Sequence, residues 1–137
     1  MSQETLIRDA VDELRAQGGR FAREAYLFVV AALGTTVHDL PSERQADPER
    51  RHLSGQELTA GVIRLAREEF GGLAPMVFRE WGVATTEDIG KIVFELVAAH
   101  QLGARPEDTP ADFVSAIDLP AALAAPTEAR TLRRHDA

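Results

Sequence analysis

Apolar residues recur every three or four positions over residues 4–17. They are Ile7, Ala10, Val11 and Leu14. This spacing places them on one face of a helix. Gly18 and Gly19 then interrupt the pattern, as glycines do where helices end. The pattern predicts a first amphipathic helix that ends before these glycines.

Residues 21–33 form the most apolar segment, and no charged residue lies between Glu24 and Asp39. A segment that is apolar on every side is expected to be buried on every side. Its alanine-rich end is followed by Gly34, in the position that often terminates helices, so we predict a central helix ending there. The β-branched and aromatic residues in its middle leave a strand as the alternative.

Residues 35–53 contain Pro41 and Pro48 and no sustained apolar period, which indicates a long connection. The next helix has the clearest start in the chain, because Ser54 and Glu57 have the spacing of a capping box. Gly71 and Gly72 are predicted to end this helix. Its expected core face is Leu58, Val62, Leu65 and Phe70.

Two more helices follow in the predicted order. A short one over residues 73–81 contains Pro75 in its first turn, where proline is tolerated, and stops at Gly82. Its expected buried face is Leu73, Met76, Val77 and Trp81. The next helix is predicted to begin after a cap at Thr85 or Thr86. Its apolar stripe is Ile89, Ile92, Val93, Leu96 and Val97.

The C-terminal part is less regular. We predict at most one small β-hairpin in residues 102–119, a brief helix from Pro120, and a disordered tail over residues 126–137. Residues 1–125 then form a single, mainly α domain of about five helices, since a chain of 137 residues suits one hydrophobic core. Helices joined by a glycine-containing turn and followed by a hairpin would give a winged-helix-like arrangement, which stays an alternative.

Composition limits the cellular setting. The chain has no cysteine, which excludes disulfides and thiolate metal sites. Its first residues lack the basic and apolar regions of a signal peptide. The longest apolar run, residues 25–33, is far shorter than the roughly 18 residues that span a bilayer. We therefore expect a cytoplasmic protein that does not enter the membrane.

A nucleic-acid-binding or transcriptional role through the winged-helix-like segment is our second hypothesis for function. The chain carries 22 acidic and 15 basic residues, a net charge of −7. Residues 84–119 hold seven acidic and two basic residues, a local net charge of −5 that would repel phosphate. The phosphate contacts would fall to Arg44, Arg50 and Arg51, so we do not expect a nucleic-acid partner.

An enzyme with an anion site is our third hypothesis, built on the cluster Arg51, His52, Ser54 and Glu57. A helix N-terminus binds anions, and His52 could act as an acid or base near neutral pH. We favour the alternative that Ser54 and Glu57 cap the helix and that His52 packs against the loop. No catalytic residue is therefore assigned.

A non-catalytic protein-interaction module is the leading hypothesis. The motifs of serine hydrolases, P-loop proteins and dinucleotide-binding proteins are missing, and we expect neither a metal nor a cofactor. The partner would be another protein or a second copy, giving a homodimer. The predicted contact surface contains Gly90, Phe94 and Val97, where apolar residues extend beyond the stripe that one core needs. A second helix packed closely over Gly90 would also explain this pattern.

Several stretches in combination resemble a family of small bacterial proteins labelled Minf. They are Arg51-His52-x-Ser54-Gly55-x-Glu57-Leu58, Glu69-Phe70-Gly71, Trp81-Gly82-Val83 and residues 86–97, followed by an acidic stretch ending in Asp112-Phe113. The similarity covers residues 21–123 and departs near His100, where family members carry a small residue and then two leucines. The resemblance implies no activity, substrate, cofactor or catalytic residue.

Overall fold

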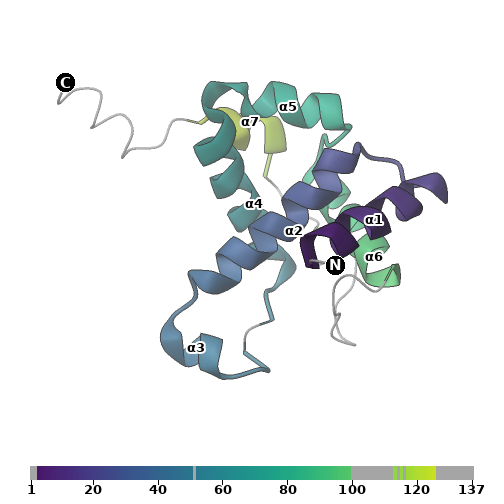
Figure 1. Cartoon of the computed structure of the whole chain (residues 1–137). Coiled ribbons are helices and arrows are strands. Elements are labelled where there is room, and N and C mark those ends of the chain that lie inside the picture. The colour runs from purple at the N-terminus through teal and green to yellow at the C-terminus, as the bar shows by residue number, and fades with distance from the viewer. Residues whose placement is uncertain (1–2, 51, 100–112, 114, 116, 126–137) are drawn as a thin grey trace.

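The computed structural model describes residues 3–50, 52–99, 113, 115 and 117–125, and this part of the chain is mainly helical (Figure 1). Its helices are α1 (Gln3–Ala16), α2 (Arg23–His38), α3 (Ser42–Ala46), α4 (Gly55–Phe70), α5 (Ala74–Trp81), α6 (Thr86–Ala98) and α7 (Leu119–Ala124), with a 3-10 turn η1 (Gly71–Leu73) between α4 and α5. None of the described residues lies in a strand. The expectation of a mainly α fold is confirmed.

Helix α2 is the centre of the fold and packs against α1, α4, α5 and α6. Its uncharged sequence leaves Ala25, Tyr26, Val29 and Ala32 buried. The alternative of a strand is wrong, and so is the predicted stop at Gly34, because the helix continues to His38. Thr36 donates a hydrogen bond to the Ala32 carbonyl within this last turn. Gly34 is exposed inside the helix and has open space where a Cβ would lie.

The predicted connection over residues 35–53 is only partly irregular. Its first residues complete α2, and α3 forms within it after Pro41. The Gln45 amide donates to the carbonyls of His38 and Leu40, both at 2.7 Å, which ties α3 to the end of α2. Figure 1 shows α3 at one end of the molecule and α5 with α7 at the other.

The caps predicted from sequence are confirmed at two helices. At α4 the Ser54 hydroxyl accepts from the Glu57 amide at 3.0 Å, and the Glu57 carboxylate accepts from the Ser54 amide at 3.0 Å. At α6 Thr85 is the cap and forms the same reciprocal pair with Asp88. Thr86 is instead buried, and its hydroxyl donates to the Phe113 carbonyl at 2.8 Å. Each of the two capping boxes satisfies backbone groups that the first helical turn leaves unpaired.

The predicted buried face of α5 is right for Val77 and Trp81, which pack against the core, and wrong for Leu73 and Met76. Leu73 and Met76 are 59% and 52% exposed, whereas Ala74 and Phe78 are buried. Gly71, with φ of 55°, and the turn η1 redirect the chain between α4 and α5, so the start of α5 turns Ala74 instead of Leu73 and Met76 towards the core. An aromatic cluster joins α5 to α4, since Phe78 lies 5.3 Å from Trp81 and Trp81 lies 5.6 Å from Phe70 between ring centroids.

The C-terminal predictions fall mostly outside the described residues. Of residues 102–119, only 113, 115 and 117–119 are described, none of them in a strand, so neither a β-hairpin nor a winged-helix arrangement is supported. The brief helix is confirmed as α7, whose first turn is capped by the Asp118 side chain. The predicted tail, residues 126–137, lies outside the described part of the chain.

Candidate functional site

The predicted anion site at the start of α4 holds an internal carboxylate. Arg44 donates from both terminal guanidinium nitrogens to the Glu57 carboxylate, at 2.6 and 3.3 Å. The same guanidinium group donates to the carbonyls of Arg50, at 2.9 Å, and His52, at 3.3 Å. Glu57 also accepts from the Ser54 amide, so its carboxylate lies where an external anion would bind. This arrangement straps the loop that carries α3 onto the first turn of α4.

The electrostatics match this structural role. Hydrogen bonds from Arg44 lower the pKa of Glu57 from its ordinary value, against burial, which raises it. The His52 side chain is exposed, and Arg51 lies outside the described residues. The geometry therefore brings Ser54 and Glu57 together as a cap, as the favoured interpretation has it, and adds Arg44. The His52 side chain, which was expected to pack against the loop, is exposed instead.

Removing the Arg44 side chain should loosen this strap. In Arg44→Gln we expect the pKa of Glu57 to rise, because the donated hydrogen bonds and the positive charge are lost. Amide hydrogen exchange of residues 42–50 should accelerate, because the hydrogen bond to the Arg50 carbonyl is lost as well. NMR titration of the Glu57 carboxyl carbon and exchange mass spectrometry measure the two effects.

The matched control for this variant is Arg50→Gln, since the Arg50 side chain is exposed and its backbone carbonyl, rather than its guanidinium, takes part in the strap. This variant should leave both readouts unchanged. Equal effects of Arg44→Gln and Arg50→Gln would mean that general charge, and not the contact between Arg44 and Glu57, determines them.

The predicted contact surface around Gly90 is partly covered by the chain itself. A Cβ at Gly90 would lie 2.8 Å from the Cβ and Cγ atoms of Phe113, so only glycine permits this close approach. The rings of Phe94 and Phe113 meet edge to face with centroids 6.2 Å apart. Phe94 and Val97 are half-buried. The close packing expected over Gly90 is present, and Phe113 provides it.

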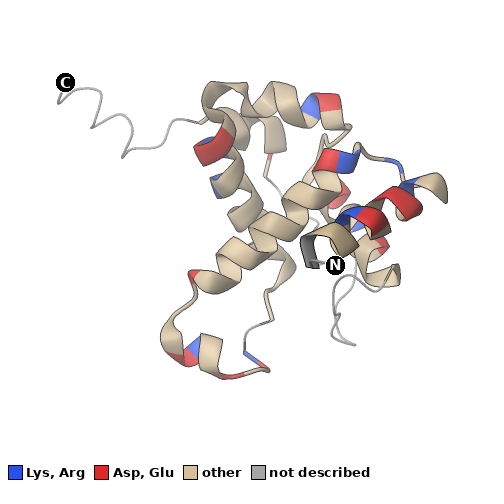
Figure 2. Ribbon diagram, in the orientation of Figure 1, with Lys and Arg blue, Asp and Glu red and all other residues tan. Residues whose placement is uncertain are grey.

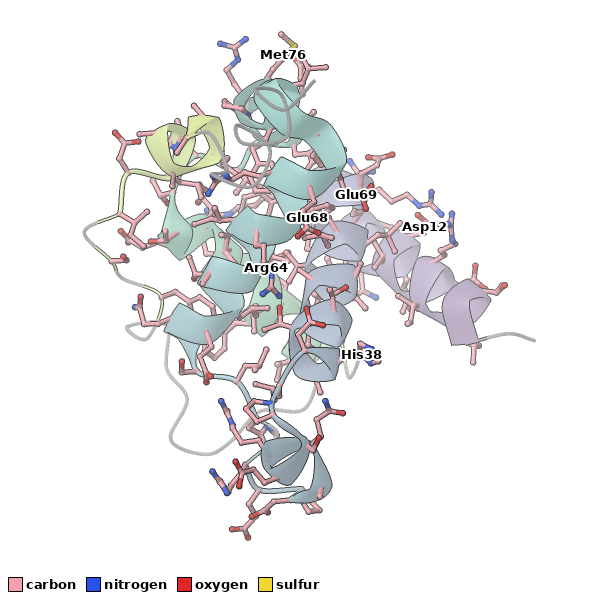
Figure 3. All side chains as sticks on the ribbon, turned by 90° about the vertical axis from the view of Figure 1, so that its left-hand side faces the viewer. Asp12, His38, Arg64, Glu68, Glu69 and Met76 are labelled. Carbon is pink, nitrogen blue, oxygen red and sulfur yellow. The ribbon has the colours of Figure 1, made fainter. Side chains whose placement is uncertain are left out.

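A different apolar surface, which sequence reasoning missed, lies between α5 and α7. A groove of about 560 Å³ is lined by Gly72, Pro75, Met76, Phe78, Arg79, Gly82, Val83, Ala84, Pro120 and Leu123. Met76, which lines the groove, and Leu73, which lies next to it on η1, are both more than half exposed. Figure 3 shows Met76 pointing outward at the end of the molecule. We call this groove, together with Leu73 and Met76, the α5–α7 face.

Charge is scarce on the α5–α7 face. Helix α5 carries only Arg79 and Glu80, and α7 carries no charged residue. Figure 2 shows this contrast, because α5 and α7 are almost entirely tan whereas α1 bears blue and red along its length. A sequence signal existed, since residues 73–81 carry more large apolar side chains than one buried face needs, namely Leu73, Met76, Val77, Phe78 and Trp81. The missing information was which of these side chains meet the core.

A second, more polar pocket of about 550 Å³ lies between α1 and α6. Glu13, Arg20 and Glu95 are among its lining residues. Glu95 accepts a hydrogen bond from the hydroxyl of Tyr26, which is fully buried and also accepts from the Phe21 amide at 3.3 Å. Burial, which is the larger cause, and the hydrogen bond to Glu95 together raise the pKa of Tyr26 to about 12.

Other classes of site find little support in the described part of the chain. No group of three or more His, Asp or Glu residues there is placed to hold a metal ion. Among the same residues, no helix is both long and apolar enough to cross a membrane. Of the three arginines considered for phosphate binding, Arg44 is engaged by Glu57 and Arg50 is exposed, while Arg51 lies outside the described residues.

No protein-family model matches the chain, and no curated protein or solved structure is similar to it.

Proposed function

We propose that this protein is a non-catalytic protein-interaction module whose contact surface is the α5–α7 face. The observation that carries the proposal is the exposure of Leu73 and Met76 beside an apolar groove. Large apolar side chains gathered beside a groove are typical of sites that bind another protein. The partner that fits is a protein surface that offers an apolar side chain to the groove and covers the two projecting ones.

The energetics favour such an occupant. Covering the exposed halves of Leu73 and Met76 would contribute roughly 1 kcal/mol each, from the area removed from water. Filling the groove against buried Phe78, Val83 and Leu123 adds to this. The near absence of charge means that few ionic groups lose water on binding, a cost that often cancels the gain from apolar contacts.

Photo-crosslinking in the native cells tests the proposal directly. A photoreactive phenylalanine analogue placed at Met76 should give a covalent protein adduct on irradiation. The same analogue at Leu6 is the matched control, because Leu6 on α1 is 53% exposed and Met76 is 52% exposed. An adduct at position 76 and none at position 6 supports the α5–α7 face. Equal yields at both positions, or none at either, would contradict it.

A further inference from the structure

We infer that the pocket between α1 and α6 is a second binding site, which takes a small organic cation such as an alkyl amine or an alkyl guanidine. The pocket shares no lining residue with the groove of the α5–α7 face, so the inference does not depend on the proposed function. Its volume of about 550 Å³ lies within the range of roughly 300–1,000 Å³ that small-molecule sites occupy.

The charge of the pocket favours a cation. Glu13 and Glu95 both line it, against the guanidinium of Arg20. The pocket also lies at the C-terminal ends of two helices, because it is lined by residues 17–19, which follow α1, and by Ala98, the last residue of α6. The C-terminal end of a helix carries partial negative charge and attracts positive groups. The carboxylates and the helix ends therefore act in the same direction.

Glu95 opposes the local preference of its own helix. A carboxylate in the last turn is disfavoured by the negative helix end, and α6 has no basic residue in that turn, whereas α1 has Arg15. Glu95 is half-buried, and none of the ion pairs among the described residues involves it. Residues that break a local rule in this way are typical of functional positions. A bound ammonium or guanidinium group would supply the missing positive charge.

Tyr26 holds the Glu95 carboxylate in place. The buried Tyr26 hydroxyl donates a hydrogen bond to Oε2 of Glu95, which leaves Oε1 to accept from a ligand. The pocket wall at Gly19 lies directly over this hydroxyl, since a Cβ there would be 2.9 Å from its oxygen. A carboxylate that is already fixed loses little conformational freedom when a ligand binds.

The rest of the lining favours an organic cation over a metal ion. Ala10, Leu14 and Ala98 offer apolar surface on which an alkyl chain can lie. Among the residues that the structure describes, no group of three or more His, Asp or Glu side chains is placed to hold a metal ion. Small-molecule sites commonly combine such an apolar lining with a few polar groups that fix orientation.

NMR titration with agmatine tests the inference, because agmatine carries a guanidinium and an ammonium group at the two ends of a short alkyl chain. The amide signals of Gly19 and Ala99 should shift and saturate, with a dissociation constant of about 1 mM or tighter. Butylurea keeps the alkyl chain and a planar head but has no charge, so it should give no saturable shift. Absence of saturation with agmatine, or equal binding of butylurea, would overturn the inference.

Variants locate the site. Glu95→Gln should weaken agmatine binding at least about tenfold, because a charge-assisted hydrogen bond is lost, and Glu13→Gln should weaken it less, because Glu13 is exposed. Ala98→Phe should abolish binding without a change of charge, since Ala98 is exposed and the ring would fill the pocket. Circular dichroism and thermal unfolding confirm that each variant folds.

The matched control is Glu43→Gln, which removes the same charge on α3, at the end of the molecule away from α1 and α6 (Figure 1). This variant should bind agmatine as the wild type does. An equal loss in Glu43→Gln and Glu95→Gln would mean that the overall acidity of the chain attracts the ligand, and unchanged binding in Ala98→Phe would mean that the ligand lies elsewhere. Either result excludes the pocket as the site.

Discussion

Replacing Gly61 by alanine is expected to lower the free energy of unfolding by about 2 kcal/mol, within the usual cost of overpacking a helix contact. Gly61 is buried on α4, where that helix crosses α2. A Cβ there would lie 2.0 Å from the Thr36 hydroxyl oxygen and 3.1 Å from its Cβ. The hydroxyl cannot turn away freely, because it donates to the Ala32 carbonyl at 2.7 Å. Urea unfolding measures the change.

Two further variants isolate the cause. Gly61→Ala in a Thr36→Ala background should recover most of the loss, since the obstructing hydroxyl and methyl groups are gone. Gly34→Ala should instead stabilise the protein by about 0.5–1 kcal/mol, because alanine favours helix and nothing lies within 4 Å of its Cβ. Additive effects of Gly61→Ala and Thr36→Ala would show that the two positions are not in contact.

Raising the pH from 10 to 12 should remove about 2 kcal/mol of stability through Tyr26 alone. Burial and the hydrogen bond to Glu95 raise the pKa of Tyr26 to about 12 in the folded protein, while an unfolded tyrosine titrates near 10. Between these values the folded state binds more protons than the unfolded state, so stability falls as pH rises. Stability from this group is complete below about pH 10.

Tyr26 is the only tyrosine in the chain, so its ionisation can be observed directly by absorbance near 295 nm. The folded protein should titrate near pH 12, and the protein in denaturant near pH 10. Tyr26→Phe should lack the fall in unfolding free energy between these pH values, and Glu95→Gln should shift the folded midpoint downwards. A folded midpoint at pH 10 would show that the phenol is open to solvent.

The sequence by itself determined the features that depend on neighbouring residues. Ser54 and Glu57 lie three positions apart in the chain. Their reciprocal capping bonds therefore form as soon as the residues that follow Ser54 adopt a helix. The stripe containing Ile89, Ile92 and Leu96 is buried as its spacing predicts. The sequence also offered Thr85 and Thr86 as candidates for the cap of α6. Only the tertiary structure distinguishes the two, because Thr86 is buried against Phe113 and Thr85 is the cap.

Tertiary structure decided everything that depends on which distant segment a side chain meets. Gly34 looked like a helix end, but α2 continues because its last turn packs against Gly61 of α4. Arg44 looked like a free cation, yet it binds a carboxylate thirteen positions away. The 3-10 turn before α5 rotated Leu73 and Met76 out of the core and left the α5–α7 face exposed. Hydrophobic spacing gives the faces of a helix, whereas only the packing of the other helices determines which face is buried.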